Sequence, residues 1–476
     1  MIELTNINEI LRQIPKVDII LDLLPQDLTH RMASNQIKTI IDEELDKIRQ
    51  RIIKGIQHEL DVNEIILTII QRIEAQLKPN LKRVINATGI ILHTNLGRAV
   101  LSKSTMKHLY DTMSHYNTLE YDLDLGRRGS RYSHIEALIC GLTGAEGALV
   151  VNNNAAAVML ILNTFASNKE VILSRGEMVE IGGSFRIPDV MKASGCKLVE
   201  VGTTNKTHLY DYENAISDQT AMFLKVHTSN YQILGFTKSV SREQLSELAK
   251  KGNRSTDSIV FYEDLGSGAM IDLAQFGLHR EPLVSECVQS GVDIVSFSGD
   301  KLLGASQAGI IVGKKKYIDA LKKNQLLRAL RIDKLSLAVL EDTLLQYMNP
   351  ERLIAQNPTV NMLAMSAESV LEKVNLFVKR HQSDLQGLGL RFAIEPMMSQ
   401  IGGGALPLEE LPSYGLCLRG DLNLNRYQFA LRQLDIPIIL KIEDETLSMD
   451  FRTLFEDDFD ELMKGLKRAL TGGLYE

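Results

Sequence analysis

The spacing of apolar residues divides the chain into a helical beginning and a longer part in which strands and helices alternate. Between residues 37 and 60, apolar side chains recur at helical spacing, which predicts an amphipathic helix. Further along, helical segments such as residues 243–251 separate short apolar runs. Strands are predicted at residues 171–173, 198–201, 221–226, 259–262, 293–297 and 309–312. This alternation predicts a mostly parallel α/β sheet with helices on both faces.

The pattern also predicts three domains. Residues 1–82 form a helical N-terminal domain, and Lys78, Lys82 and Arg83 around Pro79 mark the linker. Residues 83–345 form the large α/β domain, and residues 346–476 form a small α+β domain. Within the small domain we expect a helix over 362–381, strands over 437–442 and 446–451, and a closing helix over 457–470.

Composition narrows the class of protein without naming a function. The net charge of -7 argues against a protein that coats nucleic acid indiscriminately, although it leaves room for a local basic face. Lys47, Arg51 and Lys54 share one side of the predicted 37–60 helix, either as a solvated charged face or as a surface for phosphate groups. The four cysteines form no CxxC pair, so we expect no disulfide framework and no metal site. With no secretory signal and no membrane span in the pattern, the predicted location is cytoplasmic.

One lysine stands out chemically. Lys301 follows the predicted strand 293–297 and the small residues Ser298 and Gly299, and a glycine turn comes after it at Gly304. Burial or a cationic neighbour lowers a lysine pKa, and the neutral amine can then form a Schiff base. Enzymes that use pyridoxal 5'-phosphate (PLP) depend on such a lysine, on a carboxylate at the pyridinium nitrogen and on a cradle for the phosphate.

The sequence offers candidates for both the carboxylate at the pyridinium nitrogen and the phosphate cradle. Asp264 follows a hydrophobic strand and precedes a glycine turn, where a pyridinium partner belongs, although a strand-terminal Asp is also a common turn residue. Asn152, Asn153 and Asn154 lead from a predicted strand at 147–151 into an apolar helix at 155–165. Asparagines are natural N-caps, and a helix N-terminus suits a phosphate, but such junctions are also common as plain structure.

Several basic and polar side chains could complete a site. Arg98 follows a glycine, and three arginines lie among the glycines of 126–131, either to meet anions or as a solvated loop. Arg328 and Arg331 fall in a segment of helical spacing and are predicted to share a face, which could equally be a solvated one. His227 could stack on an aromatic ring and Asn230 could donate to a phenolate oxygen, or both could satisfy turn hydrogen bonds.

Six segments together resemble the bacterial selenocysteine synthase family over nearly the whole chain. They are residues 85–89 (INATG), 93–98 (HTNLGR), 151–157 (VNNNAAA), 174–183 (SRGEMVEIGG), 225–231 (KVHTSNY) and 296–304 (SFSGDKLLG). The resemblance implies an aspartate-aminotransferase-like (fold type I) PLP enzyme, built as a homo-oligomer that is a decameric ring of dimers. It also implies that the N-terminal domain holds the selenocysteine tRNA.

The resemblance implies roles for particular residues. Lys301 would form the internal aldimine and Asp300 would be an active-site acid. The active-site arginines would be Arg98, Arg131, Arg328 and Arg331. Together with the positions above, the predicted cofactor-binding residues are Lys301, Asp264, Asn153, Asn154, Ala155, His227, Asn230 and Ser298.

The implied reaction converts L-seryl-tRNA(Sec) to L-selenocysteinyl-tRNA(Sec), by loss of water to an aminoacrylyl-tRNA and addition of selenium from selenophosphate. Two alternatives stay open: a related PLP-dependent lyase acting on a small phosphorylated amino acid, and a tRNA-binding protein without catalysis. The chain differs from the family after Gly304, where Ala305 and Ser306 replace the usual Gly-Pro. Because alanine is less free than glycine, this difference bears on the turn near the phosphate.

Overall fold

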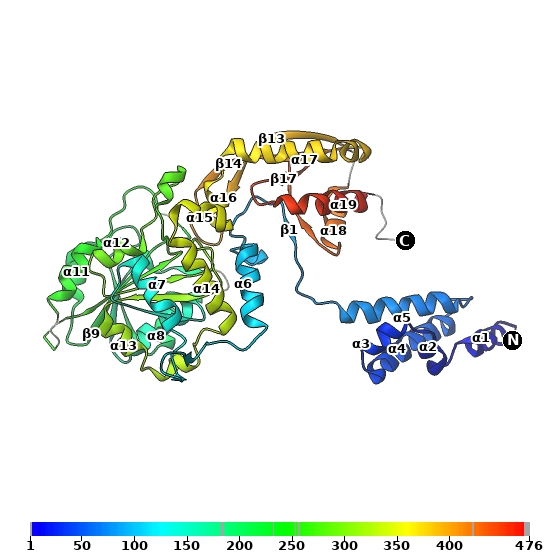
Figure 1. The fold of residues 1–476 in the computed structure, drawn as a ribbon, viewed down its shortest axis with the longest axis horizontal. Coiled ribbons are helices and arrows are strands. Elements are labelled where there is room, and N and C mark those ends of the chain that lie inside the picture. Colours follow the sequence, from blue (N-terminus) through cyan, green and yellow to red (C-terminus); the bar gives the residue numbers. More distant parts are fainter. Residues whose placement is uncertain are drawn as a thin grey trace. The chain divides into compact units, whose positions relative to one another are not determined.

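The computed structural model describes residues 2–181, 185–231, 233–252, 254–255, 258–420 and 423–470. Gly182 and Gly183 of the 174–183 motif lie outside these ranges, as do the last six residues of the domain predicted at 346–476. The chain folds as two compact units, Met1–Arg83 and Val84–Glu476 (Figure 1). The predicted division into three domains stays a prediction.

The first unit is helical and has a core of its own. Its buried side chains are mostly isoleucines, among them Ile37, Ile41 and Ile69. The predicted 37–60 helix ends earlier than expected, at Ile53, because Gly55 takes a left-handed φ of 67° and closes the last turn. The helices are α1 (Ile2–Gln13), α2 (Val17–Leu23), α3 (Gln26–Arg31), α4 (Ser34–Ile53) and α5 (Val62–Leu77).

The second unit is built on a seven-stranded sheet in the order β4-β12-β11-β10-β9-β5-β8. All its pairings are parallel except those of β12, which runs antiparallel to β11 and β4. Each predicted strand forms at its predicted place, within two residues at its N-terminal end. The strands are β4 (Gly147–Val151), β5 (Glu170–Ser174), β8 (Lys197–Val201), β9 (Thr220–Val226), β10 (Val260–Gly266), β11 (Ile294–Ser298) and β12 (Gly309–Gly313).

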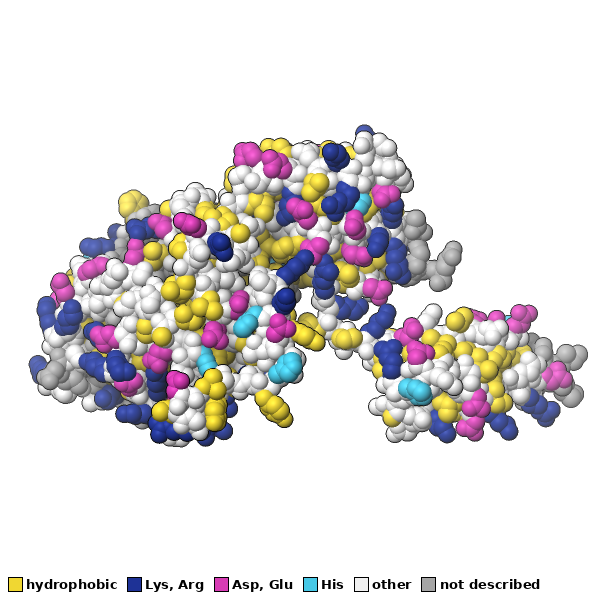
Figure 2. Space-filling view, in the orientation of Figure 1, with side chains coloured by type: hydrophobic (Ala, Val, Ile, Leu, Met, Phe, Trp, Pro, Cys, Tyr) yellow, Lys and Arg dark blue, Asp and Glu magenta, His cyan; other side chains and the backbone are white. Residues whose placement is uncertain are grey.

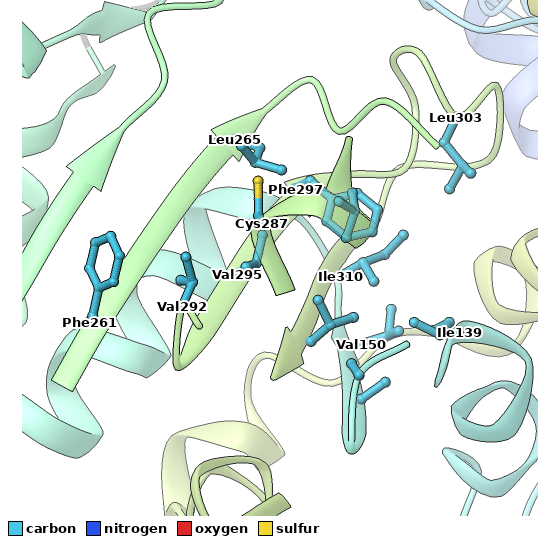
Figure 3. Close-up of a cluster of buried hydrophobic side chains, with 14 of the residues drawn as sticks. Ile139, Val150, Phe261, Leu265, Cys287, Val292, Val295, Phe297, Leu303 and Ile310 are labelled. Carbon is cyan, nitrogen blue, oxygen red and sulfur yellow. The ribbon is translucent and has the colours of Figure 1, made fainter. Parts of the chain in front are cut away.

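Helices cover both faces of this sheet, so each face buries its own apolar cluster. Figure 3 shows the first cluster, where Phe261, Val295 and Ile310 of the strands meet Ile139 of α7 and Cys287 of α12. The second cluster packs the apolar helix α8 against the other face. The surrounding helices are α6 (Lys103–Met113), α7 (Ser133–Thr143), α8 (Asn154–Ala166), α9 (Ile187–Ala193), α10 (Leu209–Ala215), α11 (Arg242–Lys250), α12 (Val284–Gln289), α13 (Lys315–Leu321) and α14 (Lys334–Tyr347).

The C-terminal part of this unit contains a four-stranded antiparallel sheet in the order β13-β14-β17-β16. Its core joins Phe377, Phe451 and Phe459, whose rings meet edge to face or at a tilt. The elements are α15 (Pro350–Gln356), α16 (Pro358–Ala364), α17 (Ala367–Gly387), β13 (Arg391–Gln400), β14 (Glu410–Arg419), α18 (Leu424–Arg432), β16 (Lys441–Glu443), β17 (Thr446–Asp450) and α19 (Phe459–Leu470).

Two sequence predictions in this part were wrong in detail. The helix predicted over 362–381 is broken, because Ser366 leaves the helical conformation and caps the start of α17 with its side chain. The strand predicted over 437–442 is divided between two sheets. Its first part, β15 (Ile438–Ile439), pairs in parallel with β1 (Ile85–Asn86), whereas β16 joins the four-stranded sheet.

Small elements complete the described chain. Two short hairpins are β2 (Tyr121–Asp122) with β3 (Arg127–Arg128), and β6 (Glu180–Ile181) with β7 (Phe185–Arg186). Across the described ranges, each helix is too short or too polar to span a lipid bilayer. On the face seen in Figure 2, basic and acidic side chains are mixed over the surface of both units.

Candidate active site

The predicted site residues gather where several strands of the large sheet end. Ser298 at the end of β11 pairs with Gly309, and Gly309 pairs in turn with Val151 at the end of β4. The segment after β4 therefore lies at the same sheet edge as the segment after β11. Because β9, β10 and β11 run parallel, their carboxyl ends meet there as well, which is where open α/β sheets bind ligands.

Lys301 is held in the turn directly after β11 and is only 4% exposed. Within the described part of the chain, its amine makes no hydrogen bond or ion pair. Burial lowers the pKa of Lys301, and the nearby Arg98 lowers it further, while Asp264 and Asp300 partly oppose the change. The arrangement favours the neutral, nucleophilic form of the amine.

Arg98 and Asp300 form an ion pair beside this lysine. Arg98 Nη1 donates to Asp300 Oδ2 at 2.7 Å, and Ala99 N donates to the Asp300 carbonyl at 3.3 Å. Arg98 has a φ of 62°, a left-handed conformation that costs a non-glycine residue about 1 kcal/mol or more. The strained backbone directs the guanidinium to the residue that precedes Lys301.

Asp264 is buried near the end of β10, 2% exposed, and three groups donate to its Oδ1. They are Asn154 Nδ2 at 2.8 Å, Gly266 N at 3.0 Å and Ser296 Oγ at 3.3 Å. Burial raises the pKa of Asp264, whereas these donors and Lys301 lower it in part. Oδ2 is left free of these contacts, so one carboxylate oxygen is available to a ligand.

The asparagine segment caps α8 as the sequence predicted. Asn153 Oδ1 accepts from Ala156 N at 2.9 Å, while the buried Oδ1 of Asn154 has no partner among the described residues. The backbone of Asn153 lies close to Gly309 at the start of β12. Only a glycine allows this approach, because a Cβ there would stand 2.1 Å from the Asn153 carbonyl oxygen. The N-terminus of α8, which begins with Asn154 and Ala155, is therefore joined to Asp264 through one side chain.

Three other predicted residues lie at the same sheet edge. His227 follows β9, and its Nε2 lies 2.9 Å from Oε2 of the buried Glu281. Asn230 Nδ2 donates to the Glu180 carbonyl at 2.9 Å, so its amide group hydrogen-bonds the protein backbone here. Ser298 is buried at the end of β11, between the strands that carry Asp264 and Gly309.

The remaining arginines belong to a second cluster. Arg131, Arg328 and Arg331 line a cavity of about 330 Å³. The predicted shared helical face is wrong: Arg328 ends a short 3-10 turn, Gln325–Arg328, and Arg331 makes a β-bridge with Val151. That bridge, together with the hydrogen bond from Asn152 N to the Leu330 carbonyl, sets the cavity beside the segment that leads into α8.

Sequence reasoning missed two acids. Glu281 pairs with His227, and Glu120 accepts hydrogen bonds from Arg131 and Arg331. Glu281 lies in a loop without a pattern. Glu120 offers only one weak signal, its position shortly before the arginine-rich loop at 126–131.

The turn that departs from the family pattern is well packed. Gly304 has a φ of 73°, and a Cβ there would collide with Asn357. Ala305 is buried and donates its N–H to the Gly299 carbonyl at 2.9 Å, while Ser306 Oγ donates to the Ser336 carbonyl at 2.7 Å. The chain thus closes the turn after Lys301 with an alanine and a serine.

Comparison with known proteins agrees with this geometry. The profile of the SelA family, L-seryl-tRNA selenium transferase, matches residues 84–455. A relative named L-seryl-tRNA(Sec) selenium transferase from Clostridium perfringens (strain 13 / Type A) is 48% identical over 463 residues, covering 96% of this chain and 98% of the relative. One of the same name from Clostridium botulinum (strain Loch Maree / Type A3) is 44% identical over 467 residues, covering 97% and 99%.

A solved structure shares the fold. D-glucosaminate-6-phosphate ammonia-lyase matches with a TM-score of 0.55 at 20% identity, covering 84% of this chain and 98% of that one. The predicted aspartate-aminotransferase-like fold class and the resemblance seen in the sequence are both confirmed. The family profile spans most of the second unit, and the relatives are close to half identical over nearly the whole chain. This chain therefore belongs to the L-seryl-tRNA(Sec) selenium transferase family.

Proposed function

We propose that this protein converts L-seryl-tRNA(Sec) to L-selenocysteinyl-tRNA(Sec), with selenophosphate as selenium donor and PLP as cofactor. Family membership supports the reaction. The observation that carries the catalytic part is Lys301, a buried amine that has a lowered pKa and no partner among the described residues. A buried lysine without a partner is costly, and a covalent role for the amine accounts for it.

The residues at the sheet edge fit this cofactor. Lys301 would hold its aldehyde carbon, Asp264 its ring nitrogen, and the N-terminus of α8 its phosphate. Asp264 Oδ2 accepts no hydrogen bond from the groups that donate to Oδ1, and the N-terminus of α8 presents backbone N–H donors of the kind that bind phosphate. His227 would lie against the ring, and Ser298 and Asn230 would complete its surroundings. When bound, PLP supplies an electron sink that stabilises negative charge at the seryl Cα.

The side chains of this protein would move the protons. Once the seryl amino group has replaced Lys301 at the aldehyde carbon, the freed amine would take the proton from the seryl Cα, because its lowered pKa favours the unprotonated form. Arg98 and Asp300 form a 2.7 Å ion pair next to Lys301 in the chain, and the charge of Arg98 disfavours the protonated form of the amine. The hydroxyl group at Cβ takes up a proton and leaves as water, and the selenium of selenophosphate adds at the same carbon. Water then cleaves the Se–P bond, which releases inorganic phosphate, and a proton returns to Cα.

The arginine cluster suits the selenium donor. Selenophosphate is anionic, and guanidinium groups bind phosphate-like oxygens with two parallel hydrogen bonds. Arg328 is exposed at the cavity and has no ion-pair partner among the described residues, and Arg331 lies beside it. We assign Arg131, Arg328 and Arg331 to this role, with Arg98 nearer to Lys301.

The proposal includes partners and a location. The helical unit Met1–Arg83 would bind the tRNA, supported by the exposed Lys47 and Arg51 of α4 and by Lys54 directly after it. The second unit would assemble into a decameric ring of dimers, which its many exposed apolar side chains support. They include Tyr110, Tyr116, Leu123, Leu125, Leu234 and Phe236. Because translation consumes aminoacyl-tRNA, this function requires the cytoplasm.

The proposal is tested with purified protein, PLP, seryl-tRNA(Sec) and selenophosphate. We expect selenocysteinyl-tRNA from the unaltered protein and none from Lys301→Ala. Lys315→Ala is the matched control, since Lys315 is an exposed lysine at the start of α13. Product formed by Lys301→Ala, or none formed by the PLP-loaded unaltered protein, would refute the proposal.

A further inference from the structure

The cavity lined by Arg131, Arg328 and Arg331 has an excess of positive charge. Among the residues that line it, six are basic and only Glu120 is acidic. Lys322 is neutralised by Glu136, whose Oε1 lies 2.6 Å from its amine. The basic lining residues are Arg128, Arg131, Lys322, Lys323, Arg328 and Arg331.

Glu120 gathers guanidinium groups from two distant parts of the chain. Its Oε1 accepts from Arg131 Nε at 3.1 Å, from Arg131 Nη2 at 2.6 Å and from Arg331 Nη1 at 3.1 Å. Its Oε2 accepts from Arg128 Nη2 at 3.2 Å. These hydrogen bonds, that of Arg131 first, lower the pKa of Glu120, so the carboxylate stays charged at neutral pH.

Arg131 completes a framework around Arg331. It is only 7% exposed, and its Nη1 donates to the carbonyl of Ile332, the residue that follows Arg331. Arg131 therefore contacts the same short segment through its own guanidinium and through Glu120. Without the carboxylate, Arg131 and Arg331 would repel each other, and Arg331 would be free to turn toward solvent.

We infer that Glu120 is a positioning residue that fixes Arg331 for an anionic, phosphate-like substrate. The inference rests on the proposed function and deepens it. One carboxylate shared by three arginines orders their side chains yet leaves the cavity with a surplus of positive charge. The net charge attracts the anion, and the shared Oε1 sets the direction from which Arg331 donates.

The test measures the kinetics of Glu120→Gln in the full-length, PLP-loaded protein. Glutamine keeps the size of the side chain but cannot hold three guanidiniums. We expect KM for selenophosphate to rise about tenfold, with kcat changed less than about threefold. The dissociation constant of inorganic phosphate, measured by calorimetry, should rise by a similar factor. Glu395→Gln is the matched control, because Glu395 accepts hydrogen bonds from Arg419 with both carboxylate oxygens. This variant should leave KM for selenophosphate and the dissociation constant of phosphate unchanged.

A double-mutant cycle separates positioning from general support of the fold. If Glu120 acts through Arg331, adding Glu120→Gln to Arg331→Ala should raise KM no further. Should Glu120→Gln fail to fold, Glu120→Asp keeps the charge on a shorter side chain, and we expect it to show a smaller rise in KM. Unchanged KM and phosphate affinity in the folded variant, or fully additive effects in the cycle, would overturn the inference. An inactive unaltered protein would instead refute the proposed function, and the phosphate titration would still compare the two proteins.

Discussion

Lys301 and Asp264 are both buried. Burial lowers the pKa of Lys301 and raises the pKa of Asp264, so it favours the neutral form of each side chain. Their mutual attraction opposes that change in each of them. In Asp264 the raised pKa means that the folded protein holds the proton more tightly than the unfolded chain. Stability from this group is therefore full below about pH 4 and is lost as pH rises toward the folded-state pKa.

We predict that Asp264→Asn separates the chemical cost of this residue from its structural cost. Asparagine can still accept from Asn154 and Gly266 through its carbonyl oxygen, but it cannot keep a ring nitrogen protonated. Turnover should fall about a hundredfold or more, with PLP still bound. The cofactor-free variant should be at least as stable as the unaltered protein at pH 7, because no carboxylate has to be buried. Thermal unfolding, PLP absorbance and the tRNA assay check the three parts, and normal turnover would contradict the role of Asp264.

At the scale of elements, the site depends on one close approach between the start of α8 and β12. Gly309 lies where any side chain would meet the backbone of Asn153. The same glycine pairs with Ser298 in β11 and with Val151 in β4. The strand order thus brings the phosphate cradle, Asp264 and Lys301 together around a glycine that bears no functional group.

Gly309→Ala should therefore weaken both folding and cofactor binding. The added Cβ would force the Asn153 turn to move, at a cost of about 1–3 kcal/mol in the free energy of unfolding. PLP affinity, measured by absorbance titration, should fall as well. Gly141→Ala is the control, since nothing lies within 4 Å of a Cβ at this position in α7. It should be neutral or stabilise by up to about 1 kcal/mol. Equal behaviour of the two variants would argue against the close approach.

At the scale of the whole molecule, the described residues of each unit form apolar clusters of their own. The apolar cluster of the first unit uses residues up to Leu77, and the clusters around the two sheets begin at Ile85. All the predicted cofactor and active-site residues belong to the second unit. Binding of PLP and recognition of tRNA should therefore be separable.

Removing residues 1–83 should leave a folded protein that binds PLP but does not convert seryl-tRNA(Sec). The expected readouts are the PLP absorbance band, a cooperative thermal transition and loss of tRNA binding by filter assay. The full-length protein in the same assays is the control. A truncated protein that still forms selenocysteinyl-tRNA at the normal rate would remove the tRNA-binding role from the first unit.

The sequence alone determined the strands of the large sheet, the cap on α8 and the place of Lys301 directly after a strand of that sheet. These features depend on periodicity, turn residues and short motifs, which are local in the chain. It did not reveal β13 and β14 or the division of residues 437–442 between two sheets, because sheet pairing decided them. Apolar periodicity also did not show the break before α17, which comes from the local side-chain cap of Ser366. Only the tertiary structure joined Asn154 to Asp264, and Glu120 to Arg331. These partners lie more than a hundred residues apart, and the topology of the sheet brings them together.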